Sequence, residues 1–203
     1  QQIKNEVGFR MKLIGLNGAI GSGKSEAARF LSDKYGYKEI TFKAEFVRRI
    51  FLSLGICDRH PDYEIYLNLF YDQELKDKSN ELLGGLTPRE VKFSFSDWVR
   101  SIDPDAFVRP TELKIKTYSK LKTQSLLDIV VSDVRFENEA QLIKRNGGVI
   151  WRIERQNNPF KIKSSHESEK DLDQKYIDLT IHNDGSLDDL AIAVGDSLEA
   201  AVV

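Results

Sequence analysis

The residues best suited to chemistry lie between Gly18 and Ser25, where the sequence reads GAIGSGKS. This run fits the pattern G-x-x-x-x-G-K-[ST], the P-loop, at every specified position. Glycines let successive backbone N–H groups turn inward, and such a concavity at a helix start binds phosphate. Lys24 would reach the β- and γ-phosphates, and the Ser25 hydroxyl would ligate Mg²⁺. The predicted phosphate-binding residues are Gly18, Ile20, Gly21, Ser22, Gly23, Lys24 and Ser25.

Two other interpretations of this run were weighed. One is a glycine-rich turn that binds nothing, which is hard to reconcile with a preceding apolar strand and a following helix. The other is a GTPase, whose D-x-x-G segment is matched by letters at Asp33–Gly36. That segment ends the helix that follows the P-loop, where it cannot meet a γ-phosphate, and an N/T-K-x-D segment is absent. The size of the chain fits a small-molecule kinase.

A second group of functional residues, Asp133 and Arg135, follows the apolar run Leu126–Ser132. In an open α/β sheet, residues at the carboxyl ends of the strands line the ligand crevice. We therefore expect both side chains in the crevice of the P-loop. There an arginine can hold a phosphate with two hydrogen bonds, and an aspartate can order Mg²⁺-bound water. The alternative is an ion pair that only stabilises the end of the strand.

The elements that must position these residues alternate along the chain. Apolar runs predict strands, and periodic apolar residues predict helices between them. This alternation predicts an α/β fold with three layers, α/β/α, around a mostly parallel five-stranded sheet. The expected strands are 11–17, 37–41, 126–132, 149–153 and 176–181.

Several helix boundaries follow from local signals. Thr87 with Pro88 and Glu90 predicts a capped helix that runs to about Arg100. A further helix is expected from Asp103-Pro104, with Pro110 kinking or restarting it. Helices are also expected over 24–34, 42–54 and 136–145, and a last one is capped by Ser186 with Leu187, Leu190, Val194 and Leu198 on one face.

Composition excludes several classes of protein. The chain has 203 residues, 40% hydrophobic and 31% charged, with a net charge of -2. No apolar run reaches the roughly 18 residues of a membrane span. Its one cysteine, Cys57, excludes an internal disulfide framework and indicates a reducing compartment. We expect residues 1–10 to be an extension and 11–203 a single kinase domain, with an inserted helical acceptor-binding and lid region over 57–110.

Longer segments resemble a known family. The run IVVSDVRFENEAQLIKRNGGVIWRIER, followed by SSHESE and IHNDGSLDDL, is similar to the phage-type deoxynucleoside monophosphate kinases. The resemblance extends in order from Met11 to the C-terminal helix. It implies a P-loop enzyme that transfers the γ-phosphoryl group of ATP to a deoxynucleoside monophosphate, with Mg²⁺ as cofactor.

The resemblance also implies roles for individual residues. Thr41–Arg48 resembles the family's F-A-D-x-x-K segment, which faces the acceptor nucleotide; here Glu45 replaces Asp and Arg48 replaces Lys. Leu86–Val108 resembles its T-P-R…G-T-[DE]-x-x-R…D-P-D-x-W-V segment, which makes Arg100 a phosphate contact. Phe95-Ser96 replaces Gly-Thr there, and Phe107 replaces Trp, so the preferred acceptor base stays open.

Other site residues keep two interpretations. Asn183 and Gly185 would lie beside the donor adenine, or they form a turn that only caps the final helix. His166 and Glu169 are candidates for substrate contact, or they belong to a solvated loop. Trp98 is expected in the core, with stacking on the acceptor base as the alternative.

The sequence thus predicts a nucleoside monophosphate kinase that uses ATP and Mg²⁺. Balanced charge argues against stable binding to nucleic acid. We expect a cytoplasmic protein of a bacterium or a phage-infected host, with a homodimer left open. The alternatives are a P-loop kinase that acts on a hydroxyl of a small molecule or of DNA, with Asp133 as base, and a regulatory protein that binds ATP without turnover.

Overall fold

A computed structural model describes residues 12–72, 74–120, 127–158 and 171–200. The chain forms two compact units, which we call the sheet unit (Gln1–Thr41 with Glu112–Val203) and the helical unit (Phe42–Thr111). The expected extension, 1–10, lies outside the described residues. A single kinase domain with an inserted helical region stays a prediction.

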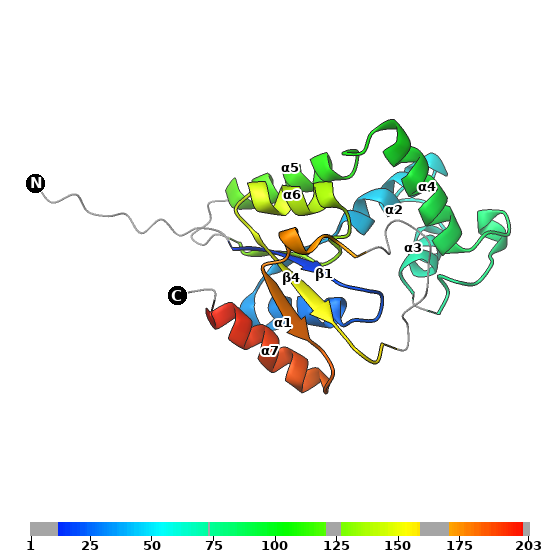
Figure 1. Ribbon diagram of the computed structural model, residues 1–203. Helices are drawn as coiled ribbons and strands as arrows, with labels where there is room; N and C mark the ends of the chain where they lie inside the picture. Colours follow the sequence, from blue (N-terminus) through cyan, green and yellow to red (C-terminus); the bar gives the residue numbers. More distant parts are fainter. Residues whose placement is uncertain (1–11, 73, 121–126, 159–170, 201–203) are drawn as a thin grey trace, which may run out of the picture. The chain divides into compact units, whose positions relative to one another are not determined.

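The sheet unit is built on five parallel strands in the order β2-β3-β1-β4-β5 (Figure 1). The predicted parallel sheet is therefore confirmed. Because β1 and β3 are parallel neighbours, the residues that follow them lie side by side at the carboxyl ends of the strands. The chain crosses from β3 over β1 to β4, and such a switch point is where open α/β sheets bind ligands. The strands are β1 (Leu13–Asn17), β2 (Lys38–Ile40), β3 (Ile129–Val131), β4 (Val149–Glu154) and β5 (Leu179–His182).

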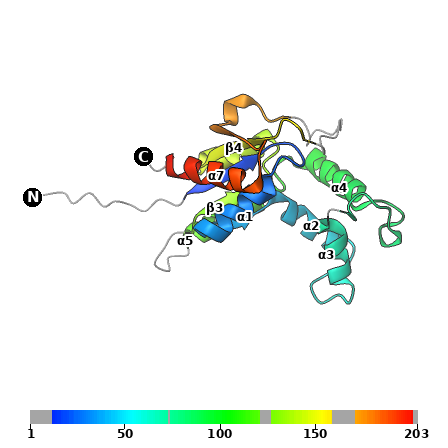
Figure 2. The ribbon, with the colours of Figure 1, turned by 90° about the horizontal axis from the view of Figure 1, so that it is seen from below.

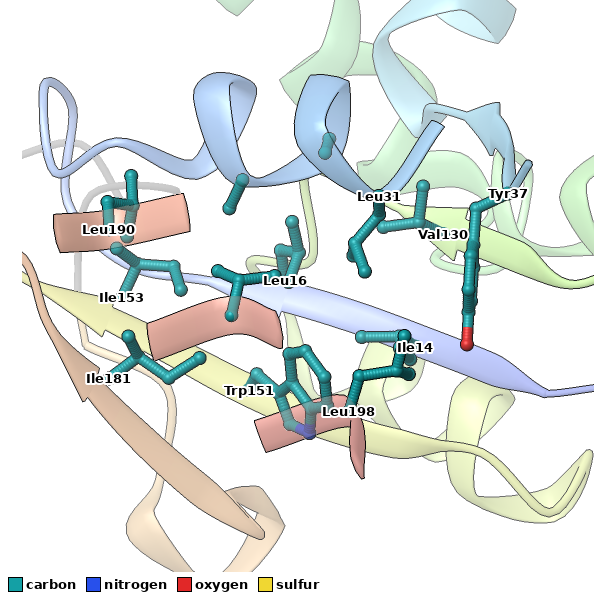
Figure 3. Packing of buried hydrophobic residues seen from close by; sticks show 13 residues of the cluster. Ile14, Leu16, Leu31, Tyr37, Val130, Trp151, Ile153, Ile181, Leu190 and Leu198 are labelled. Carbon is teal, nitrogen blue, oxygen red and sulfur yellow. The ribbon is translucent and has the colours of Figure 1, made fainter. Parts of the chain in front are cut away.

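Helices cover both faces of this sheet, which confirms the predicted three layers (Figures 1 and 2). On one face lie α1 (Lys24–Tyr35) and α7 (Leu187–Ala200), and on the other lies α6 (Glu137–Arg145). Figure 3 shows the core under α1 and α7, where side chains of the strands meet side chains of both helices. Its fully buried members include Leu16, Leu31, Ile153 and Val194.

The opposite face packs tightly against α6. A Cβ atom on Gly15 of β1 would lie 3.0 Å from a Val134 side-chain carbon and 3.1 Å from one of Ile143 in α6. A larger residue at this position would force these side chains to shift, so β1 packs closely against α6. A further helix, α5 (Val108–Lys120), is linked to α6 by a hydrogen bond that the Arg145 side chain donates to the Glu112 carboxylate at 2.8 Å.

The helical unit consists of α2 (Phe42–Ser53), α3 (Tyr63–Tyr71), the short 3-10 helix η1 (Glu81–Leu83) and α4 (Pro88–Ile102). Thr87 caps α4 as predicted: the Glu90 N–H donates to its hydroxyl at 3.1 Å, and the Thr87 N–H donates to the Glu90 carboxylate at 2.8 Å. The unit has its own apolar core, formed by Val47, Ile50, Phe51, Ile56, Leu69, Phe70 and Leu83.

One predicted helix start was wrong. No helix begins at Asp103-Pro104. The next helix, α5, begins at Val108. Pro110 then falls in the first turn of α5, where proline is tolerated, and it causes no break. Of the residues predicted on one face of the last helix, Leu190, Val194 and Leu198 are buried, whereas Leu187, the first residue of α7, is 60% exposed.

The expected burial of Trp98 was also wrong, since 62% of it is exposed. Two residues before it, Ser96 is buried in the helical unit. Successive helical residues are about 100° apart, so Trp98 points about 200° away from Ser96, to the opposite side of α4. Among the described residues, no helix is long and apolar enough to cross a membrane.

Candidate active site

The P-loop connects β1 to α1 and requires its glycines for two reasons. Gly18, Gly21 and Gly23 have φ angles of 143°, 75° and 106°, which side-chain-bearing residues rarely adopt. A Cβ atom on Gly18 would also lie 2.3 Å from the Ile153 carbonyl oxygen. The alternation of backbone conformations turns N–H groups toward one concave side. These backbone angles are compatible with the predicted phosphate cradle.

Lys24 lies across the start of this loop. It is buried, and its ammonium donates to the carbonyl oxygens of Gly18 at 2.6 Å and Ala19 at 2.7 Å. Ser25 is an exposed residue on the first turn of α1. Ser22 behaves differently, since its hydroxyl is buried and its N–H donates to the Ala19 carbonyl at 3.2 Å. Ser22 therefore closes the turn of the loop.

Two hydrogen bonds hold the segment after β3 against the end of β1. The Val134 N–H donates to the Leu16 carbonyl at 3.1 Å, and the Asn17 side chain donates to the Val134 carbonyl at 2.9 Å. Asp133 and Arg135 flank Val134 and are half-buried. Both therefore lie at the carboxyl end of β1, where the P-loop begins, so the structure brings these three predicted features together.

Two residues that support this segment were missed in the sequence. Asn17 also accepts a hydrogen bond from Arg152 Nε at 3.1 Å, which ties β4 to the same point. Glu139 is buried, and one of its carboxylate oxygens accepts from the N–H groups of Arg135 at 2.8 Å and Phe136 at 3.1 Å. It stands at the third position of α6, where glutamate commonly caps, and that position was the available signal.

Asn183 and Gly185 follow β5. Asn183 is buried, and its amide donates to the Ser22 carbonyl of the P-loop at 2.8 Å. Gly185 is exposed, and a Cβ atom there would lie 2.5 Å from the Asp189 carboxylate. That carboxylate accepts from the Ser186 hydroxyl at 2.7 Å and N–H at 2.8 Å, and these bonds lower the pKa of Asp189. The turn thus caps α7 and also contacts the phosphate loop.

In the helical unit, Glu45 organises two arginines of α2. Its buried carboxylate accepts a hydrogen bond from Arg48 at 2.8 Å and lies 3.5 Å from Arg49 Nε. The hydrogen bond to Glu45 raises the pKa of Arg48, which keeps the guanidinium charged. The Arg48 side chain itself is 58% exposed. An exposed cation held in place by a buried carboxylate is suited to binding an anion.

Arg100 and Arg49 both contact Phe107. The guanidinium carbons lie 5.1 Å and 5.3 Å from the centroid of its buried ring, within cation–π range. Arg49 also donates to the Ala106 carbonyl at 2.9 Å. Arg49 was not predicted as a site residue, although it stands four residues after Glu45, the spacing of a helical ion pair.

The predicted residues are therefore distributed over both units. Lys24, Asp133 and Arg135 belong to the sheet unit, and each unit is organised by its own contacts. Glu45, Arg48, Trp98 and Arg100 belong to the helical unit. His166 and Glu169 lie outside the described residues. Within the described ranges, no cluster of three or more His, Cys, Asp or Glu is arranged to hold a metal ion.

Comparison with known proteins supports the sequence-based resemblance. The family model described as deoxynucleotide monophosphate kinase matches residues 99–194. A protein of Acanthamoeba polyphaga mimivirus, named "Putative deoxynucleotide monophosphate kinase", is 29% identical over 189 residues, which cover 88% of this chain and 92% of that protein. The resemblance to deoxynucleotide monophosphate kinases is thereby confirmed.

One solved structure supports the fold. The TT1252 protein from Thermus thermophilus has a TM-score of 0.50 at 21% identity, over 94% of this chain and 98% of that one. At that identity the likeness concerns the fold alone. Dephospho-CoA kinase from Campylobacter jejuni is also similar, with a TM-score of 0.46 at 15% identity over 93% and 96% of the two chains.

Proposed function

We infer that this chain, as a relative of the deoxynucleotide monophosphate kinases, is a phosphotransferase that moves the γ-phosphoryl group of ATP to a nucleoside monophosphate. One observation carries the inference: Val134 is hydrogen-bonded to the end of β1, so Asp133 and Arg135 flank the start of the P-loop. The family match covers this second segment, whereas the P-loop lies outside it and supports the inference independently.

The catalytic work assigned to these residues is positioning and charge stabilisation. Phosphoryl transfer needs the donor and acceptor oxygens in line and cations around the moving group. We assign the N–H groups of the P-loop and the Lys24 ammonium to the phosphates of ATP. Arg135 is assigned to the acceptor phosphate. Because that phosphate is already an anion, the reaction needs no strong general base.

The resemblance also assigns acceptor contacts to residues of the helical unit. Arg48 and Arg100 would bind the acceptor nucleotide, since each is a guanidinium held by a contact within its unit. Trp98 offers an exposed indole on which a base could stack. We propose that the region over 57–110 closes on the acceptor to exclude water, because an open site would waste ATP by hydrolysis.

The residues present fit a magnesium ion. Ser25 offers an exposed hydroxyl at the first turn of α1, and Asp133 offers a carboxylate at the neighbouring strand end. Both are hard oxygen donors of the type that Mg²⁺ prefers. When bound, the ion would neutralise charge on the β- and γ-phosphates.

We also propose that the enzyme acts in the cytoplasm, with small nucleotides rather than nucleic acid as partners.

The experiment that tests this function is an acceptor panel. ADP release from ATP·Mg²⁺ is measured with dTMP, dGMP, dCMP, dAMP, their ribonucleotide counterparts and hydroxyl acceptors such as nucleosides. We expect release that depends on at least one monophosphate. Release only with a hydroxyl acceptor would reassign Asp133 as a base, and tight ATP binding without release would indicate a regulatory protein.

A further inference from the structure

Two asparagines from distant parts of the sequence donate hydrogen bonds to the P-loop. Asn158, after β4, donates to the Ile20 carbonyl at 2.6 Å, and Asn183, after β5, donates to the Ser22 carbonyl at 2.8 Å. They are 138 and 161 residues away from their partners in the chain. The loop is therefore held by residues that follow β4 and β5, the two strands on one side of β1.

These bonds bear on the direction of the N–H groups. The Ile20 carbonyl shares a peptide unit with the N–H of Gly21, and the Ser22 carbonyl shares one with the N–H of Gly23. In a planar trans peptide the C=O and the N–H point in opposite directions. An amide that fixes the direction of either carbonyl therefore also fixes the paired N–H, which points the opposite way. Gly21 and Gly23 have the positive φ angles that this arrangement requires.

Asn183 is itself firmly held. Its own N–H donates to the Glu154 carbonyl at the end of β4 at 2.7 Å, and it is only 7% exposed. A Cβ atom on Gly23 would lie 2.3 Å from its side-chain nitrogen, so the amide packs directly against the loop. The side-chain amide of Asn183, for which the family resemblance implies a place beside the donor adenine, thus donates to the P-loop backbone.

We propose that Asn158 and Asn183 are positioning residues that hold the P-loop in its phosphate-binding shape, and that they serve the polyphosphate of the donor and not its base. The inference rests on the proposed binding of ATP phosphates by the P-loop. A direct contact of Asn183 with adenine is the rival account, and it makes a different prediction for a ligand without a base.

Inorganic tripolyphosphate is the ligand that separates the two accounts. Its affinity and that of ATP, both with Mg²⁺, are measured by calorimetry on the full chain and on Asn158→Ala and Asn183→Ala, which add no charge. We expect both ligands to bind about tenfold more weakly, a loss of about 1.4 kcal/mol. Weaker ATP binding with unchanged tripolyphosphate binding would support the adenine contact and overturn the proposal.

Asn146→Ala is the matched control. Asn146 also donates its amide to a carbonyl, that of Leu142 at 2.8 Å, but at the end of α6 that leads into β4, away from the carboxyl ends of the strands. We expect this variant to bind both ligands like the wild type. An equal loss in Asn146→Ala would mean that general destabilisation explains the effect, which would also overturn the proposal.

Hydrogen exchange without ligand provides a second measurement. The amides over 18–25 should exchange faster in Asn158→Ala and Asn183→Ala and at the wild-type rate in Asn146→Ala. Asn158 is half-buried beside the exposed stretch 155–157, so its variant serves if Asn183→Ala does not fold. A wild type that binds neither ligand would overturn the proposed function as well. Wild-type binding with unchanged affinity and exchange in both variants would overturn only the role of the asparagines.

Discussion

At the scale of single residues, the proposed chemistry depends on cations held before a substrate arrives. Lys24 is buried against carbonyl oxygens of its own loop, and Arg135 is fixed at its backbone by Glu139. Preorganised charges of this kind need little rearrangement during the reaction, which is the main source of electrostatic catalysis. The two residues can be tested separately, since one is assigned to the donor and the other to the acceptor.

Lys24→Ala should lower turnover by about 10²–10³-fold, the typical cost of losing a charge-stabilising donor. The fold should be retained, because the lysine is part of the loop and not of the apolar core. Steady-state ADP release and circular dichroism measure the two effects. Lys34→Ala is the control: Lys34 lies in the last turn of α1, the helix that begins at Lys24, and the variant should keep wild-type turnover. Near-normal activity of Lys24→Ala would show that the P-loop is not the donor site.

Arg135→Ala should raise the KM for the acceptor monophosphate more than it weakens ATP binding. The guanidinium can contribute two charge-assisted hydrogen bonds to a phosphate, so a loss of about tenfold or more in acceptor kcat/KM is expected. Arg145→Ala removes a surface arginine of α6 that pairs with Glu112 and provides the comparison. Equal weakening of ATP and acceptor would place Arg135 on the donor side.

Residue-level prediction was most specific where a motif carries its own chemistry. The glycines, Lys24 and Ser25 could be predicted as phosphate-binding because each atom of the loop has a defined role toward phosphate. Asn17, Glu139 and Asn158 were missed, because their partners are backbone groups that only the folded chain brings near. Trp98 was misplaced for a related reason, since the buried side of α4 depends on the rest of the helical unit.

At the scale of elements, helix ends carry a measurable electrostatic signature. Hydrogen bonds from Thr87 lower the pKa of Glu90, and hydrogen bonds from Ser186 lower the pKa of Asp189. A carboxylate whose pKa is lower in the folded state stabilises that state at pH values above its unfolded pKa. This stabilisation is lost as the pH falls through the folded pKa.

The free energy of unfolding should therefore be steady from pH 7 to about 5 and decline as the pH falls below about 4. Asp189→Asn should show a shallower decline, because an amide neither titrates nor accepts the Ser186 bonds as strongly. Denaturant titrations at several pH values measure the slope. Asp188→Asn is the neighbouring control, since Asp188 also lies in the first turn of α7. An identical slope in both variants would exclude the cap as the cause.

Element type was predictable and element ends were less so. The β-branched and apolar runs specified β1, β3 and β4, because a parallel sheet largely buries both faces of its central strands. The edge strands β2 and β5 are more polar and more exposed. Thr87-Pro88 specified the start of α4, since a cap acts locally. Asp103-Pro104 gave the same kind of signal without a helix: Asp103 instead ends α4 as its C-cap, and its side chain pairs with Arg109 across the turn that follows. That ion pair forms between residues on either side of the turn and cannot be read from one dipeptide.

At the scale of the whole molecule, a net charge of -2 conceals local groups of cations within each unit. The sheet unit places Lys24 and Arg135 near the end of β1, and the helical unit places Arg49 and Arg100 on one buried ring. Such local groups suit small phosphorylated ligands, whereas a nucleic-acid backbone needs many contacts along a surface. The composition predicted the absence of a large basic face, but only the fold shows where the cations gather.

The two tryptophans allow a test of whether the chain unfolds as a single domain. Trp151 is 2% exposed in the core of the sheet unit, whereas α2, α3 and α4 of the helical unit contribute strongly to circular dichroism. In Trp98→Phe, urea unfolding followed by fluorescence reports on the sheet unit, and dichroism reports on the helices of both units.

The helical unit has 70 residues, from Phe42 to Thr111, and a small core, so it should depend on the rest of the chain for stability. We therefore expect coincident transitions. Loss of dichroism at lower urea than loss of Trp151 fluorescence would show that the helical unit unfolds on its own.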